Sequence, residues 1–201
     1  MPDVSITLAE QARALLGLEG LAVLMAIAYL LLAIRQNIWC WLCAGISTAI
    51  YVWLFVDARL YMESALNAFY FAMAVYGWNT WRSGASTSGE MPVTTWPSAR
   101  HAAAVAAILL LAVANGYALS RWSDAAYPYV DSLTTWGAIW ATFLVARKVL
   151  ENWAYWLVID LASIVIYWNR GLELTALLFV AYVVMIPFGY LSWRRSMPQS
   201  Q

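Results

Sequence analysis

The sequence predicts an all-α integral membrane protein with seven transmembrane helices. Charged residues make up 11% of the 201 residues and hydrophobic residues 64%, whereas an ordinary soluble domain carries roughly 25% charged residues. Seven apolar runs are long enough to cross a hydrocarbon layer of about 30 Å. The runs are apolar all round and lack the alternation of a lipid-facing strand, so helices are needed to satisfy their backbone groups in lipid.

The expected spans follow one another along the chain with short connections. They cover, in order, residues 14–34, 38–56, 60–81, 102–120, 132–147, 153–169 and 172–193. The first run is longer than the core of a signal peptide, so we expect it to be retained as a span. Residues 83–99 are rich in Gly, Ser, Thr and Pro, and we expect them to form a flexible cytoplasmic loop that serves as a plain tether.

The chain contains an internal repeat at an offset of 112 positions. "RQNIWCW" (35–41) aligns with "RKVLENW" (147–153), and "YGWNTWR" (76–82) aligns with "FGYLSWR" (188–194). Each copy holds three spans. Because one further span separates the copies, they run parallel, and two parallel triplets are typical of transporters that rock two halves around a central site.

This 3+1+3 pattern predicts four segments. They are the first span-triplet repeat (1–82), a region with the cytoplasmic loop, linker span and outer loop (83–131), the second span-triplet repeat (132–195), and a cytoplasmic tail (196–201).

The positive charges beside the span ends predict the orientation in the membrane. Seven lie on one side: Arg35, Arg82, Arg100, Arg147, Lys148, Arg194 and Arg195. Four lie on the other: Arg13, Arg59, Arg121 and Arg170. The side with more positive charges should be cytoplasmic, which places the N-terminus outside and the C-terminus in the cytoplasm. The net charge is zero and there is no basic tract, so no nucleic-acid partner is indicated.

The sixth span carries a polar stripe on one helical face. Its members are separated by four, four, three and four residues: Asn152, Trp156, Asp160, Ser163 and Tyr167. A central Asp costs roughly 2.5–3.5 kcal/mol to insert in a bilayer, so Asp160 is not expected to face lipid. We interpret the stripe as a substrate-binding face. The alternative is a structural carboxylate, hydrogen-bonded to a neighbouring span or carried as the neutral acid.

Aromatic side chains near the stripe suggest what it would recognise. An indole beside a carboxylate suits a flat ring that is polar or positively charged. Further candidate substrate-binding residues come from two other spans: Asn67, Tyr70 and Trp78 in the third, and Trp136 and Trp140 in the fifth. Each aromatic residue taken singly is more typical of packing or of an interfacial anchor.

Several kinds of site are not supported by the sequence. Cys40 and Cys43 are spaced as C-x-x-C but fall inside a span, and we interpret them as structural cysteines. The single histidine, His101, stands at the cytoplasmic start of the fourth span, which leaves no His-based metal site or triad at the midplane. No P-loop is present. We therefore expect no metal, no cofactor and no enzyme activity, but passive or ion-coupled movement of a solute.

Three motifs resemble the PnuC family of vitamin transporters: "YGWNTW" (76–81), "ENWAYWLVIDLASIVIY" (151–167) and "GLELTALLFVAY" (171–182). The resemblance covers about Leu15 to Arg195 and implies a carrier of nicotinamide riboside, whose pyridinium ring is cationic. It implies facilitated diffusion, maintained by phosphorylation of the substrate inside the cell, together with a homotrimer and a repeat organisation like that of SWEET sugar transporters.

The family's N-x-x-x-W-x-x-x-D pattern falls on Asn152, Trp156 and Asp160. Relatives on the same scaffold carry thiamine or riboflavin, so the vitamin itself stays open. A membrane receptor that only binds a small molecule, and a proton-coupled carrier that uses Asp160 as a relay, are the remaining alternatives.

Overall fold

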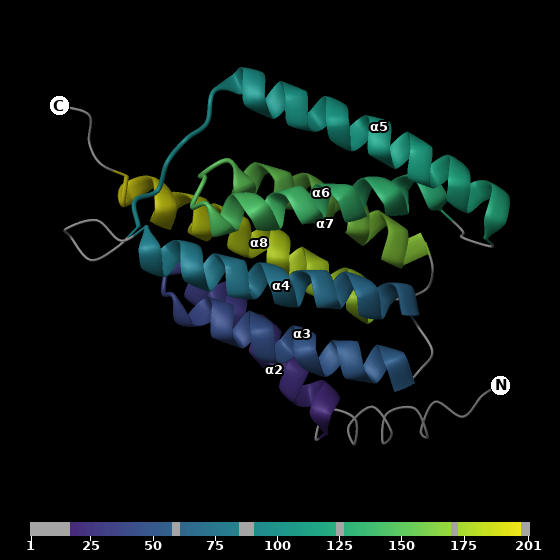
Figure 1. Ribbon diagram of the computed structural model, residues 1–201, viewed down its shortest axis with the longest axis horizontal. Coiled ribbons are helices and arrows are strands. Elements are labelled where there is room, and N and C mark those ends of the chain that lie inside the picture. The colour runs from purple at the N-terminus through teal and green to yellow at the C-terminus, as the bar shows by residue number, and fades with distance from the viewer. Residues whose placement is uncertain (1–16, 58–60, 85–90, 124–126, 170–172, 198–201) are drawn as a thin grey trace. The chain divides into compact units, whose positions relative to one another are not determined.

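The structure is a computed structural model that describes residues 17–57, 61–84, 91–123, 127–169 and 173–197. These residues form seven α-helices (Figure 1). In chain order they are α2 (Leu18–Ile34), α3 (Trp39–Asp57), α4 (Tyr61–Ser83), α5 (Ser98–Trp122), α6 (Pro128–Ala146), α7 (Asn152–Asn169) and α8 (Glu173–Arg195). Residues 14–16, Arg13, Arg59 and Arg170, which enter the expected first span and the orientation, lie outside the described residues.

The helices match the seven expected spans one for one, and the differences have local causes. The linker helix α5 begins at Ser98, four residues before the expected apolar run. Pro97, which precedes it, has an extended backbone, and the polar residues that follow form the first turn of the helix. Similarly, α6 begins at Pro128, and a proline is well suited to the first turn because it needs no hydrogen-bond acceptor there.

The chain divides into two compact units, residues 1–90 and 91–201. In the first unit α3 packs against both α2 and α4. In the second unit α5 packs on α6, α6 on α7, and α7 on α8. The linker helix is held to α6 by a 3.1 Å hydrogen bond from Asn115 Nδ2 to Ser132 Oγ. A Cβ atom at Gly116 would press on Tyr129, so the small residue lets α5 approach α6 closely.

The two repeats share the same backbone at the corner after their first helix. Arg35 and Arg147 end α2 and α6 with nearly identical dihedrals. The next residues, Gln36 and Lys148, both lie in the left-handed region, with φ of 56° and 48°. The hydrogen bonds also correspond, since Asn37 N–H donates to Leu32 O at 2.9 Å and Val149 N–H donates to Leu144 O at 2.9 Å. The sequence repeat is therefore a structural repeat.

A tryptophan contact also recurs between the second and third helices of each repeat. The ring centroids of Trp41 and Trp81 are 5.5 Å apart at 87°, and those of Trp153 and Trp193 are 5.6 Å apart at 87°. In both copies an indole occupies the space that a Cβ atom would need: Trp41 does so at Gly77, and Trp153 at Gly189. The order of the helices and these matching contacts agree with the 3+1+3 organisation.

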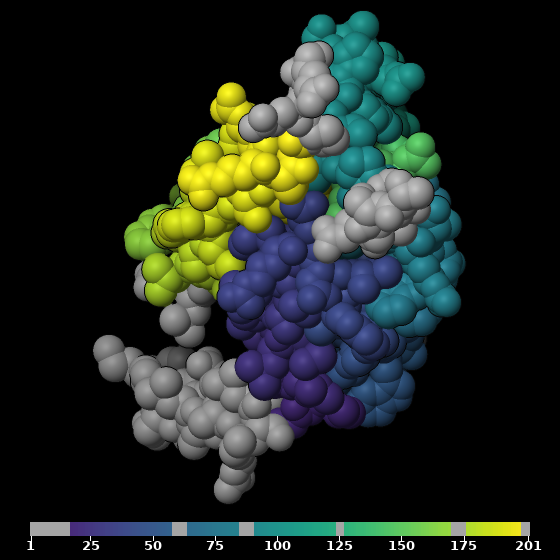
Figure 2. All heavy atoms as spheres, turned by 90° about the vertical axis from the view of Figure 1, so that its left-hand side faces the viewer, coloured from purple at the N-terminus to yellow at the C-terminus, as the bar shows by residue number. Residues whose placement is uncertain are grey.

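The helix surfaces are apolar outward, as lipid-facing surfaces should be. Leu110 on α5 is 73% exposed and Phe188 on α8 is 65% exposed, and Figure 2 shows α8, in yellow, at the surface. By length and hydropathy alone, three of the described helices can cross a membrane: Trp39–Asp57, Ser98–Trp122 and Ala176–Arg195. The other described helices, α7 among them, are not included.

Candidate functional site

The polar stripe of α7 lies on the buried face of that helix. Asn152 is 0% exposed and Asp160 is 5% exposed; Ser163 is also buried, and Trp156 and Tyr167 are half-buried. The exposed residues of α7 between them are apolar: Leu157, Val158, Leu161 and Val165. The expectation that Asp160 turns away from lipid is confirmed.

Two polar groups of the stripe are buried without a partner among the residues that the structure describes. The Asp160 carboxylate makes no hydrogen bond or ion pair with the described residues. Asn152 donates from Nδ2 to Val149 O at 2.7 Å, while its Oδ1 is buried and bonds to nothing in that part of the chain. A buried polar atom that is left unpaired costs about 1–3 kcal/mol, so a ligand that pairs with it can recover that energy.

The five stripe positions differ between the repeats, and the differences favour the second repeat as the place where a substrate binds. Asn152 corresponds to Cys40 at the offset of 112 positions. Asp160 corresponds to Thr48, whose hydroxyl donates to Ala44 O at 2.7 Å within its own helix. Among the described residues, the polar group of the first repeat is therefore satisfied locally, whereas the carboxylate of the second is not.

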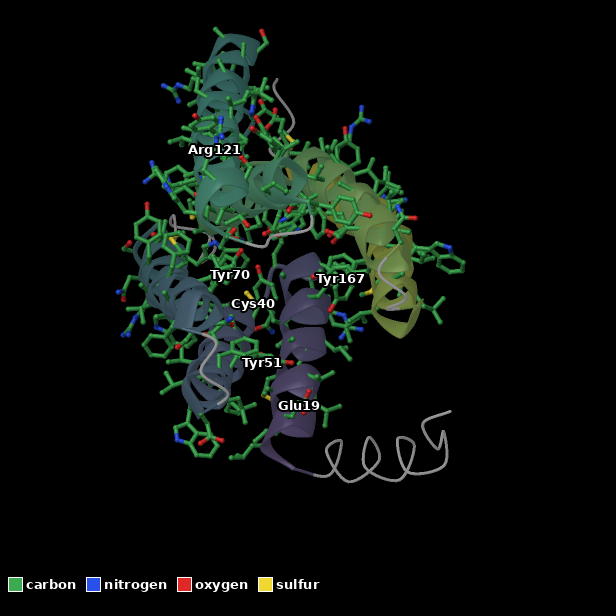
Figure 3. All side chains as sticks on the ribbon, turned by 90° about the vertical axis from the view of Figure 1, so that its right-hand side faces the viewer. Glu19, Cys40, Tyr51, Tyr70, Arg121 and Tyr167 are labelled. Carbon is green, nitrogen blue, oxygen red and sulfur yellow. The ribbon has the colours of Figure 1, made fainter. Side chains whose placement is uncertain are left out.

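The far end of the stripe is aromatic. Tyr167 stacks on Phe179 of α8, with ring centroids 5.3 Å apart and planes at 20°. Tyr182 meets the same Phe179 edge-on at 5.6 Å. In the first unit Tyr51 and Phe55 stack in a similar way at 5.5 Å. Tyr51 and Tyr167 are labelled in Figure 3.

The two α6 candidates, Trp136 and Trp140, belong to the same unit as the stripe. The indole of Trp140 interacts with the side chain of Tyr155. The indole nitrogen of Trp136 is buried and has no hydrogen-bond partner among the described residues. The same is true of Trp41 and Trp153, whose rings pack on glycines, so an unpaired indole is by itself a weak sign of a ligand. Trp140 also packs on Phe143 of its own helix, with ring centroids 5.5 Å apart.

The other three candidates lie in the first unit, on α4. Trp78 packs edge-on against Trp39, with ring centroids 5.4 Å apart and planes at 70°. Because Trp39 is exposed, this pair fits the interfacial-anchor alternative. Tyr70 contacts Phe69 at 5.7 Å, and Asn67 is half-buried.

The expected flexible loop is in part a fixed segment, which corrects the interpretation of residues 83–99 as a plain tether. Residues 85–90 lie outside the described residues. Residues 91–97, which we call the strap, run along the corner between α6 and α7, where Thr94 pairs with Val149 in a parallel β-bridge. Val93 is buried at 2% exposure. The strap was missed because backbone pairing leaves no trace in composition, although Val93 and Trp96 are two apolar residues in an otherwise polar stretch.

The strap brings a second polar cluster to the start of α7. The ring of Trp96 lies 6.0 Å from that of Trp140 and 6.4 Å from that of His101. Trp96 N–H donates to a Glu151 carboxylate oxygen at 3.4 Å. His101 Nδ1 lies 3.1 Å from the Tyr155 hydroxyl, and its Nε2 lies 3.7 Å from the same Glu151 oxygen. Sequence reasoning placed His101 correctly at the start of the linker span but did not bring it to Glu151 and Tyr155.

Comparison with known proteins identifies the family. The sequence profile described as "Nicotinamide mononucleotide transporter" matches residues 16–195. The riboflavin/roseoflavin transporter RibM of Streptomyces davaonensis is 25% identical over 177 residues, which cover 85% of this chain and 81% of RibM. The nicotinamide riboside transporter PnuC of Escherichia coli is 24% identical over 168 residues, which cover 71% of this chain and 70% of PnuC.

The fold has a solved counterpart. The crystal structure of the vitamin B3 transporter PnuC superposes with a TM-score of 0.71 at 21% identity, covering 95% of this chain and 85% of that one. The matches are to transporters and not to enzymes, and the apolar helices make this a multi-pass membrane protein. The chain belongs to the nicotinamide mononucleotide transporter family and is a PnuC-type vitamin transporter.

Proposed function

We propose that this chain carries nicotinamide riboside across the bacterial inner membrane by facilitated diffusion. The two repeats rock against each other to give alternating access, and phosphorylation of the arriving substrate in the cytoplasm maintains the inward gradient. The proposal includes a cytoplasmic C-terminus, an outside N-terminus and a homotrimer. The PnuC transporters of Escherichia coli and Neisseria mucosa, at 24% and 26% identity, support this substrate.

The observation that carries the proposal is the Asp160 carboxylate, which is 5% exposed and makes no hydrogen bond or ion pair with the described residues. It lies on the same helix face as the buried Asn152 Oδ1, which has no hydrogen-bond partner in that part of the chain. A pyridinium ring offers a positive charge to a carboxylate, and its carboxamide and ribose hydroxyls offer hydrogen-bond donors to an amide oxygen. The half-buried Trp156, one turn from each, offers an indole face to a cationic ring.

Uptake into proteoliposomes tests this function. Purified protein is reconstituted without any other protein, and entry of labelled nicotinamide riboside is measured with and without unlabelled riboflavin, thiamine or nicotinamide riboside. We expect saturable entry that unlabelled nicotinamide riboside suppresses and the other two suppress weakly. Binding without entry would indicate a receptor instead of a carrier.

Riboflavin is the second candidate substrate because RibM, a riboflavin/roseoflavin transporter, is 25% identical over 85% of this chain. Thiamine, also a cationic aromatic, is the third. Riboflavin has no fixed positive charge, so it gains less from a carboxylate than nicotinamide riboside does. Suppression of tracer entry by riboflavin at lower concentrations than by nicotinamide riboside would transfer the assignment to the flavin.

The uniport mechanism requires that transport be independent of a proton gradient. Entry of labelled substrate is compared in proteoliposomes with equal internal and external pH and in proteoliposomes with an imposed pH difference. We expect equal initial rates. A rate that follows the imposed gradient would assign the proton-relay role to Asp160 and exclude the uniporter.

A further inference from the structure

The strap makes two backbone hydrogen bonds to the corner between α6 and α7. Thr94 N–H donates to Lys148 O at 2.9 Å, and Leu150 N–H donates to Thr94 O at 2.8 Å. On either side of this bridge, Val93 is buried and Trp96 is held against Trp140. All of these residues belong to the second unit, so the strap is a fixed part of that unit.

The equivalent corner of the first repeat is built differently. There Asn37 occupies the position of Val149, and its Oδ1 accepts the N–H of Trp39 at 3.0 Å. The corner thus provides a side-chain acceptor for its own helix start. Val149 has no polar side chain, and the second corner receives its additional hydrogen bonds from the strap. The two corners have the same backbone conformation, but the first is stabilised by its own Asn37 side chain and the second by the strap.

One peptide group links the strap to Asn152. The peptide between Val149 and Leu150 is planar, so its N–H and C=O point in opposite directions. Its N–H, on Leu150, donates to Thr94 O. Its carbonyl, on Val149, accepts from Asn152 Nδ2 at 2.7 Å. A carbonyl accepts but never donates, so it holds the amide nitrogen of Asn152 and leaves Oδ1 as the free acceptor.

We propose that the strap is a positioning element for substrate binding, acting through Thr94 on the Val149–Leu150 peptide and thereby fixing which way the Asn152 amide faces. This rests on the proposed function only in taking Asn152 as a substrate contact. Without the strap the Leu150 N–H loses its acceptor, and the peptide is held only through its carbonyl, which also accepts the Asn152 backbone N–H at 3.1 Å. The direction of the Oδ1 acceptor is then less well fixed. Affinity then falls, while the rocking of the repeats continues.

The test uses Thr94→Pro, which removes the N–H donor to Lys148 O. The Thr94 carbonyl that accepts from Leu150 N–H remains, but it loses the adjacent bond that holds it in place, so the bond to the Val149–Leu150 peptide is weakened. Two variants serve as controls. Thr94→Ala keeps both backbone bonds and changes only an exposed side chain. Thr95→Pro places a proline at the neighbouring residue, whose N–H bonds to no described residue. Initial rates of nicotinamide riboside entry into proteoliposomes give the half-saturation concentration and the maximal rate for each variant.

We expect Thr94→Pro to raise the half-saturation concentration about 3- to 10-fold, the range set by losing one or two neutral hydrogen bonds, with the maximal rate within about twofold. Both controls should stay within about twofold of the parent in both quantities. A higher maximal rate at unchanged half-saturation would show that the strap is a gate and would overturn the positioning role. So would a Thr95→Pro variant that behaves like Thr94→Pro.

A double-mutant cycle separates positioning from a general structural effect. Thr94→Pro is measured in the parent and in an Asn152→Ala background. Positioning requires the 3- to 10-fold effect to disappear when the Asn152 amide is absent. An equal fold-change in both backgrounds would mean that the strap acts elsewhere, and the proposal would be wrong.

Hydrogen exchange keeps the proposal testable apart from transport. Peptides covering residues 147–152 should exchange faster in Thr94→Pro than in Thr94→Ala, whatever solute is carried. Absence of nicotinamide riboside entry in the parent would refute the proposed function, whereas unchanged exchange at this corner would refute the strap. If Thr94→Pro does not fold, Val93→Ala removes the strap's buried anchor and should shift exchange and half-saturation in the same directions. Faster exchange with unchanged half-saturation in that variant would overturn the positioning role.

Discussion

The indole of Trp153 occupies the space beside Gly189 that any larger residue at that position would need. Trp41 stands in the same relation to Gly77 in the other repeat. Because each indole also meets a second tryptophan edge-on, it has little freedom to move aside. These glycines are therefore required for packing, and both copies of the repeat should respond to substitution in the same way.

Gly189→Ala and Gly77→Ala should each lower the stability of the folded protein by about 1–3 kcal/mol through overpacking. The measurement is the thermal unfolding midpoint of detergent-purified protein. Gly45→Ala is the matched control, because a Cβ atom there would make ordinary contacts at 3.9 Å with Ala74 and Phe71. That variant should be neutral or gain from the higher helix propensity of alanine. Equal midpoints for all three alanine variants would contradict the packing argument.

Asp160→Asn should weaken the binding of a cationic substrate about tenfold or more, since hydrogen bonds to a charged group are worth about 1.5–3 kcal/mol. The change keeps the size of the side chain and removes its charge. Binding of nicotinamide riboside to purified protein is compared with binding of riboflavin, which should be less affected. Asp131→Asn, at an exposed residue in the first turn of α6, serves as the control and should leave affinity unchanged. An Asp160→Asn variant with parental affinity would remove this carboxylate from the site.

Asn152→Cys places at this position the residue that the first repeat has at its equivalent, Cys40. Both side chains are completely buried at the start of their helices, so the variant should fold with an unfolding midpoint close to that of the parent. It lacks the amide oxygen, and its substrate affinity should fall about 3- to 10-fold, in keeping with one or two neutral hydrogen bonds. Calorimetric titration with nicotinamide riboside measures the change. An affinity equal to that of the parent would show that Oδ1 does not contact the substrate.

Substitutions at Gln36 test whether the corner after α2 needs a left-handed backbone. The φ of Gln36, 56°, is unfavourable for a side chain branched at Cβ. Gln36→Val should destabilise the first repeat by about 1–2 kcal/mol, the cost of left-handed backbone for an L-residue, while Gln36→Gly should be tolerated. Urea or thermal unfolding of the two variants against the parent measures this. If valine proved as stable as glycine, the corner would have to adopt another backbone in solution.

The fold could be predicted from the sequence because its main determinants are local and periodic. The apolar runs predicted the helices. The recurrence of Gly77 and Trp81 as Gly189 and Trp193 predicted the repeat. Burial of Asp160 followed from the cost of a charge in lipid. The strap could not be predicted in this way, because the bonds of Thr94 are made by its backbone to residues about 55 positions away.

The candidate site was predictable in part for the same reason. Asn152, Asp160 and Ser163 share a face through helical periodicity, and the structure buries all three. Pairing between residues distant in sequence is not periodic. The edge-on contact of Trp78 with the exposed Trp39 and the meeting of His101 with Glu151 therefore had no signal beyond the residue types themselves.

The difference between Asn37 and Val149, which are equivalent positions of the two repeats, decides whether one repeat could stand in for the other. A protein assembled from two first halves would have self-sufficient turns at both places but no carboxylate halfway along either middle helix. One assembled from two second halves would carry the carboxylate twice, and its leading turn would lack the segment that braces it, because that segment enters the chain between the halves. The two repeats can therefore not replace one another, because the second repeat depends on the segment that connects them.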